Sequence, residues 1–171
     1  MKTKYSEFLN ENKQQELDMF NHKLFYHLHG GNIIDSIENI NIFKQYFGGE
    51  IPNNLKYDGT VYRIMQTKRK DLYDFFLKTG FNVFPNQKYY GCSKTLDGIE
   101  IVKQKTLRKR YKYFVIFKIY VTKDDVLFDV NKMIDYMGLD EDSFKGEQEV
   151  LIKSDKIPSM NKENIIDFGV L

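Results

Sequence analysis

The chain has 171 residues, of which 42% are hydrophobic and 15% aromatic, and its formal net charge is +2. This length and composition predict one globular domain with its own core, and the small charge gives no general attraction to nucleic acid or anionic lipid. The longest apolar run, Tyr113–Phe117, is too short to span a bilayer, and the single cysteine, Cys92, excludes an internal disulfide and a cysteine-built metal site.

Two helices are expected in the first third of the chain. Apolar residues recur at helical spacing, first at Leu17, Phe20 and Leu24 and then from Ile33 to Phe47, and each series ends at a pair of glycines. The segment before them mixes charged residues with isolated apolar ones and lacks the continuous apolar stretch of a secretory signal. We therefore expect a protein that acts in the cytoplasm, without a membrane partner.

Strand patterns dominate the remainder. The expected strands are Thr60–Met65, Lys88–Cys92, Tyr111–Val121, Val126–Val130, the segment that begins at Glu147, and Ile165–Phe168. Short helices are expected over Arg69–Thr79 with Leu72, Phe75 and Phe76 buried, after Thr95 with Ile99 and Val102 buried, and over Asn131–Met137. This order argues for a single α+β domain with a helical lobe over residues 1–50 and a β core over 57–171.

The most informative segment joins two glutamates to an apolar run. Glu147 and Glu149 are separated by one residue and are followed by Val150–Ile152. In a strand they would point to the same face, with Cα atoms about 7 Å apart. Because no lysine or arginine lies between them, the two carboxylates would repel each other, so a chemical role explains the pattern better than a stabilising one.

Two other polar elements lie on or beside expected strands, namely Arg63 and the pair Ser93 and Thr95. In this order, the Arg, Ser-x-Thr and Glu-x-Glu elements resemble those of mono-ADP-ribosyltransferases of the bacterial toxin and bacteriophage type, which transfer ADP-ribose from NAD to arginine. Phe144, three residues before the first glutamate, matches an aromatic position of the toxin members. The resemblance covers roughly residues 57–154. It implies a split pair of mostly antiparallel β-sheets with an N-terminal helical lobe, NAD as substrate and no metal.

The resemblance also implies roles for these residues. Glu149 would bind the ribose 2′-hydroxyl and stabilise the positive charge that develops when the nicotinamide bond breaks. Glu147, with Phe144, would recognise the acceptor guanidinium, which matches a carboxylate in a bidentate fork. Arg63 would bind the NAD pyrophosphate, and the Ser93 hydroxyl would keep Glu149 and the nicotinamide ribose in register.

Further contacts with NAD are expected from Thr95, Tyr62 and Tyr90, although the aromatic ring that stacks on nicotinamide is left open. Simpler interpretations apply to the same residues taken one by one. Ser93 and Thr95 are also typical of a helix cap, and a Glu-x-Glu pair is commonly a solvated strand face. Lys94 is a departure from the family pattern, in which threonine is more usual at that position.

The resemblance favours a monomeric phage or bacterial enzyme that modifies host machinery by transferring ADP-ribose to arginine residues of proteins. Several alternatives remain. Water in place of the acceptor would give an NAD glycohydrolase, and the same fold without catalysis would give a binding module. Six basic residues lie within the ten positions 103–112, which usually indicates a solvated turn but makes RNA a conceivable acceptor. The three histidines lack the spacing of a zinc helix, and Cys92 is expected to be a buried thiol.

Overall fold

A computed structural model describes residues 44–45, 47–80, 89–107, 110–138, 146–154 and 160–171. The chain divides into two compact units, Met1–Pro52 and Asn53–Leu171. The two helices expected before residue 48 lie almost entirely outside the described residues, as does Phe144. In the first unit, the described part is a short helical end that turns at Gly48 and Gly49, whose φ angles are +75° and +127°.

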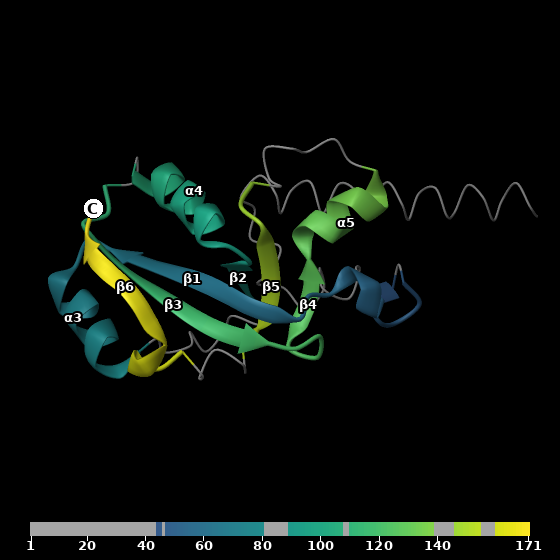
Figure 1. Cartoon of the computed structure of the whole chain (residues 1–171), viewed down its shortest axis with the longest axis horizontal. Helices are drawn as coiled ribbons and strands as arrows, with labels where there is room; N and C mark the ends of the chain where they lie inside the picture. Colours follow the sequence, from purple (N-terminus) through teal and green to yellow (C-terminus); the bar gives the residue numbers. More distant parts are fainter. Residues whose placement is uncertain (1–43, 46, 81–88, 108–109, 139–145, 155–159) are drawn as a thin grey trace, which may run out of the picture. The chain divides into compact units, whose positions relative to one another are not determined.

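The second unit is α+β (Figure 1). Its strands are β1 (Gly59–Thr67), β2 (Tyr89–Ser93), β3 (Tyr113–Val121), β4 (Val126–Asp129), β5 (Glu149–Lys153) and β6 (Ile165–Val170). Its helices are α3 (Lys70–Thr79), α4 (Leu96–Leu107) and α5 (Val130–Met137), with short 3-10 turns η1 (Asn53–Leu55) and η3 (Lys162–Asn164). Apart from the late start of β5, the elements expected from Thr60 onward are confirmed to within a few residues.

The six strands form one sheet in the order β4-β5-β2-β1-β3-β6, with antiparallel neighbours throughout. β1 pairs with β3 along its whole length, but with β2 through a single register pair, Tyr62 with Ser93. The structure therefore has a single sheet where a pair of sheets was expected. This sheet narrows to one residue pair between its two halves, β4-β5-β2 and β1-β3-β6. In Figure 1, β4 and β5 run in a clearly different direction from β1, β3 and β6.

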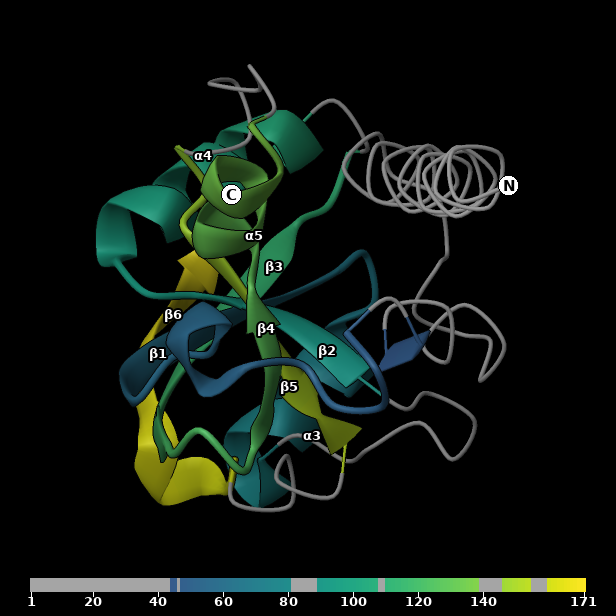
Figure 2. The ribbon, with the colours of Figure 1, turned by 90° about the vertical axis from the view of Figure 1, so that its right-hand side faces the viewer.

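Side-chain alternation divides the core between the two faces of the sheet. Val115, Phe117 and their odd-numbered neighbours on β3 pack with α3, whereas Phe114 and Ile116 pack with Ile99 of α4. Figures 1 and 2 show α3 and α4 on these opposite faces.

The expected apolar stripe of α3 is only partly correct. Phe76 is buried and Leu72 packs against the core, but Phe75 is 40% exposed. Phe75 and Phe76 are adjacent on a helix of about 3.6 residues per turn and therefore point in directions about 100° apart. Only one of the two side chains can therefore point directly at the sheet, and that side chain is Phe76.

Candidate active site

Ser93 lies where the two halves of the sheet meet. It is the last residue of β2, pairs with Tyr62 of β1 on one side and with Glu149 of β5 on the other, and is 3% exposed. Its Oγ lies 2.8 Å from the backbone oxygens of both Thr95 and Glu147 and accepts from the Thr95 backbone N–H at 3.2 Å. The hydroxyl therefore joins the end of β2 to the turn that precedes β5.

Arg63 follows Tyr62 on β1, immediately beyond the single pair that links the two halves. Its Nη1 donates a hydrogen bond to the carbonyl oxygen of Gly91 on β2, and its Cζ lies 5.3 Å from the centroid of the Tyr90 ring. The buried Nε–H has no hydrogen-bond partner among the described residues. An unsatisfied buried N–H of a charged group is costly, so this donor needs an acceptor that the described residues do not supply.

Glu149 approaches the same glycine from β5. A Cβ built on Gly91 would lie 2.2 Å from Glu149 Oε1, so the carboxylate occupies the space that any other residue at this position would fill. Arg63 and Glu149 thus converge on Gly91, which the sequence analysis did not single out. The available signal was a glycine inside a predicted strand, which often marks a close approach of another group.

The expectation that Glu147 and Glu149 share one strand is wrong. β5 begins at Glu149, Glu147 lies in the preceding turn, and Gln148 between them has a left-handed φ of +52°. The two-residue side-chain period of a strand therefore does not apply across this segment. The turn is fixed in another way, because the Gln148 carbonyl oxygen accepts from the Lys94 N–H at 2.9 Å and the Glu147 carbonyl oxygen contacts Ser93 Oγ.

Glu147 has a cationic partner from a distant part of the chain. Its Oε1 contacts the ammonium of Lys105, in the last turn of α4. The Glu147 side chain is 23% exposed and that of Lys105 51% exposed. No lysine or arginine lies between the two glutamates, but Glu147 contacts a lysine 42 residues away in the sequence. The carboxylate expected to bind an acceptor guanidinium therefore already contacts a positive charge.

Thr95 acts as the cap of α4, as its simpler interpretation predicted. Its Oγ1 accepts from the Gly98 N–H at 3.1 Å, which satisfies one of the free donors of the first helical turn. A Cβ on Gly98 would lie 2.3 Å from the Glu147 carbonyl oxygen and 2.2 Å from Ser93 Oγ. The start of α4 is therefore in close contact with both the Ser-x-Thr segment and the turn that contains Glu147.

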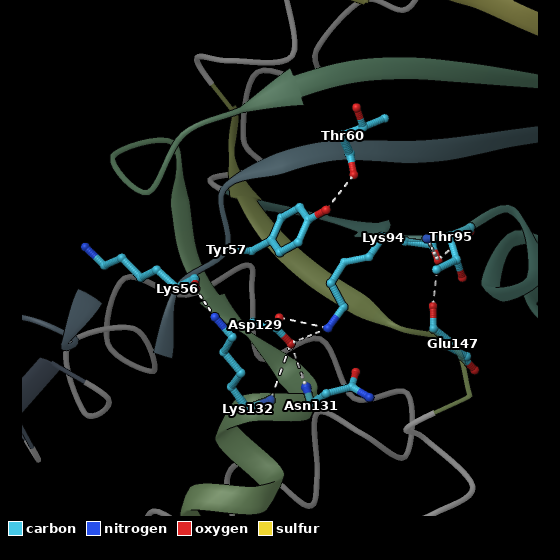
Figure 3. A network of polar contacts seen from close by, with 10 residues as sticks. Lys56, Tyr57, Thr60, Lys94, Thr95, Asp129, Asn131, Lys132 and Glu147 are labelled. Atoms are coloured by element: carbon cyan, nitrogen blue, oxygen red, sulfur yellow. Dashed lines mark hydrogen bonds and ion pairs between the residues drawn. The ribbon is translucent and has the colours of Figure 1, made fainter. Parts of the chain in front are cut away.

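Lys94 has a structural partner on the core side (Figure 3). Its Nζ lies 2.8 and 3.0 Å from the two carboxylate oxygens of Asp129, which is fully buried, and 5.9 Å from the Tyr57 ring centroid. Asp129 also caps α5, since its Oδ1 accepts from the backbone N–H groups of Asn131 and Lys132. Lys94 thus anchors the Ser-x-Thr segment to the start of α5.

The two tyrosines expected to contact NAD differ in accessibility. Tyr62 is half-buried beside Ser93, whereas Tyr90 is 0% exposed and lies in the core beneath the Arg63 guanidinium. Tyr90 therefore offers no exposed ring surface for stacking on nicotinamide. Its position instead supports Arg63, because a guanidinium over an aromatic face is favourable.

Cys92 is buried behind the site, as expected for an unreactive thiol. Burial raises the pKa of this thiol from 9.0 to about 12, while the positive charge of Arg63 lowers it and the negative charge of Glu149 raises it. Both charges act on the same thiol, which agrees with their convergence on Gly91. At neutral pH the group is a neutral thiol and therefore a poor nucleophile.

Other features of the described residues do not compete with this site. No three His, Cys, Asp or Glu side chains within the described ranges could together hold a metal ion, and no described helix is long and apolar enough to cross a membrane. A shallow groove of about 290 Å³ lies over β1 and β3 and is lined by Thr60, Lys118, Tyr120, Glu163 and Ile166, among others. None of the candidate residues lines it.

Comparison with protein-family models, with curated proteins and with solved structures gives no match to this chain. The function must therefore be inferred from the chemistry of the site. That chemistry comprises a guanidinium with a buried donor that lacks a described partner, a carboxylate over a glycine, a buried hydroxyl and a second carboxylate in contact with an ammonium.

Proposed function

We propose that the chain is an arginine-directed mono-ADP-ribosyltransferase that uses NAD and needs no metal. The observation that carries the proposal is the convergence of Arg63 and Glu149 on Gly91, two residues before Ser93 on β2. These residues come from three different strands and are the ones that the family resemblance assigns to NAD. The buried Arg63 Nε–H without a partner among the described residues gives further support, because buried donors normally have an acceptor.

In the proposed reaction, the side chains of Glu149, Arg63 and Ser93 have one role each. The bond between ribose C1′ and the nicotinamide nitrogen breaks, the electron pair leaves with neutral nicotinamide, and C1′ becomes positively charged. The Glu149 carboxylate stabilises that charge from its place over Gly91 at the start of β5. Arg63 binds the pyrophosphate through the donors that Gly91 does not use, and Ser93 keeps the turn before Glu149 in place.

Glu147 serves the second step, in which the acceptor arginine attacks the ribose. A guanidinium nitrogen of the target attacks C1′, a new carbon–nitrogen bond forms, and the guanidinium loses one proton. The Glu147 carboxylate orients the fork of the guanidinium and accepts that proton or passes it to water. In the described structure this carboxylate contacts Lys105. That contact favours a second candidate, NAD glycohydrolase activity, because water needs no guanidinium site.

The experiment follows the ADP-ribose group. The protein is incubated with NAD labelled in its adenosine part and a bacterial lysate, and labelled products are separated into protein, RNA and free ADP-ribose. We expect labelled protein with the label on arginine in mass spectra, and a loss of at least about a hundredfold in rate for Glu149→Gln. Glu163→Gln is the matched control, because it removes one carboxylate from an exposed position on η3.

Each product distinguishes one alternative. Free ADP-ribose alone would assign the glycohydrolase, and labelled RNA would assign an RNA acceptor. Equal labelling by the wild-type chain and Glu149→Gln would refute the role of Glu149. Absence of any product, together with absence of NAD binding in calorimetry, would leave a non-catalytic binding module.

A further inference from the structure

We propose that Lys105 is a competitor for the acceptor guanidinium and so sets the specificity of the site between arginine and water. This inference rests on the proposed function and adds a residue to it. The Lys105 ammonium and an incoming arginine would interact with the same carboxylate of Glu147. Either cation can occupy it, but not both in the same geometry.

The position of Lys105 follows from how α4 packs on the turn before β5. Gly98 allows the start of the helix to contact the Glu147 carbonyl oxygen, and Ile101 lies one turn later, with its Cδ1 3.2 Å from the place of a Cβ on Gly146. Lys105 is seven residues after Gly98, two helical turns on, and therefore on the same side of α4. The helix thus brings this lysine to Glu147 as a fixed part of the fold.

The exposure of the pair allows exchange. The Lys105 side chain is 51% exposed and that of Glu147 23% exposed, so solvent and a ligand can reach the contact. Ion pairs of this kind are weak, because water screens them and two long side chains must be ordered. An ammonium is a point charge, whereas a guanidinium donates two parallel hydrogen bonds to a carboxylate. An arginine can therefore displace Lys105, but it must compete with it.

The test compares three substitutions at one helix. Lys105→Gln removes the competitor, and we expect the KM for free arginine as acceptor to fall about twofold to fivefold with little change in kcat. Lys105→Arg replaces the ammonium with a guanidinium, which competes better, and should raise that KM. Lys103→Gln is the matched control, because Lys103 lies on the same helix but pairs with Glu100 at 3.4 Å.

Two further measurements separate competition from a structural effect. With labelled NAD and no acceptor, the KM for NAD should be the same in Lys105→Gln and the wild-type chain, because Lys105 contacts the carboxylate of the acceptor site. In a Glu147→Gln background, the substitutions at Lys105 should no longer change the KM for arginine, because the shared carboxylate is gone.

Two outcomes overturn the inference and are distinguishable. Transfer to arginine with the same KM in the wild-type chain, Lys105→Gln and Lys105→Arg would refute competition and leave the proposed transferase intact. Absence of any transfer to arginine by the wild-type chain, at saturating NAD and arginine, would refute the transferase and the competition together.

Discussion

Two lysine–carboxylate pairs stand at the two ends of α4 and differ in their surroundings. Lys94, just before the helix, pairs with Asp129, and their side chains are 15% and 0% exposed. Lys105, in the last turn, pairs with Glu147, and their side chains are 51% and 23% exposed. Breaking a buried pair leaves an uncompensated charge, whereas a partly exposed pair is screened by water. Loss of one partner of the first pair should therefore destabilise the fold strongly, whereas the second pair can exchange partners.

The largest expected effect tests the buried pair. Asp129→Ala leaves the Lys94 ammonium buried and removes the cap of α5, so we expect the free energy of unfolding to fall by about 3–5 kcal/mol in urea denaturation. Lys105→Gln, the matched change in the exposed pair, should lower it by less than about 1 kcal/mol. A loss in Asp129→Ala no larger than in Lys105→Gln would contradict the distinction between the two pairs.

Substitutions at two glycines extend this comparison, because one should mainly change stability and the other mainly activity. Gly98→Ala places a Cβ 2.3 Å from the backbone oxygen of Glu147, which cannot move freely, so unfolding should become easier by about 1–3 kcal/mol. Gly91→Ala meets only the terminal carboxylate of Glu149, which can rotate away. We expect a smaller change in stability there, but at least a tenfold slower transfer, since the carboxylate is displaced.

Urea denaturation and transfer kinetics on both glycine variants check this prediction. If Gly91→Ala retained the wild-type transfer rate, the Glu149 carboxylate would not need its place over that glycine. The stability of Gly98→Ala serves as the reference for a clash that the fold cannot relieve.

The smallest effect concerns Cys92 and appears only at high pH. Burial raises the pKa of this thiol from 9.0 to about 12, so the unfolded chain releases the proton more readily than the folded one above pH 9. The contribution to stability is therefore fully present below pH 9 and is lost as the pH rises toward 12. Wild-type and Cys92→Ala chains should differ in the pH dependence of the free energy of unfolding between pH 9 and 10.5. Parallel pH profiles would contradict a buried neutral thiol.

Local patterns predicted most of the fold. β1, β3 and β6 have β-branched and aromatic runs, and α5 ends at Gly138, which adopts the left-handed conformation. These signals depend only on neighbours along the chain. The burial of Phe75 was predicted wrongly, because the choice between adjacent phenylalanines is made by the sheet that α3 packs against.

The sequence predicted most of the residues that belong to the candidate site, but not the contacts that they make with one another. The pairing of Lys105 with Glu147 and of Lys94 with Asp129 joins positions 42 and 35 residues apart. No periodicity encodes such contacts, because they arise from the packing of helices on the sheet. The left-handed Gln148 was also missed, since glutamine carries no turn signal and the strand pattern after it was strong.

The single register pair between β1 and β2 has a consequence for how the chain can evolve. Tyr62 and Ser93 form the single ladder pair between the two three-stranded halves, so the halves are joined mainly by side chains. In the shared core, residues of β1 and β3 pack with residues of β2 and β5. Relatives of this chain should then differ most in the edge strands β4 and β6, and least in the few residues around that junction and in the core that both halves share. The narrowest place in the sheet would be the one under the strongest selection.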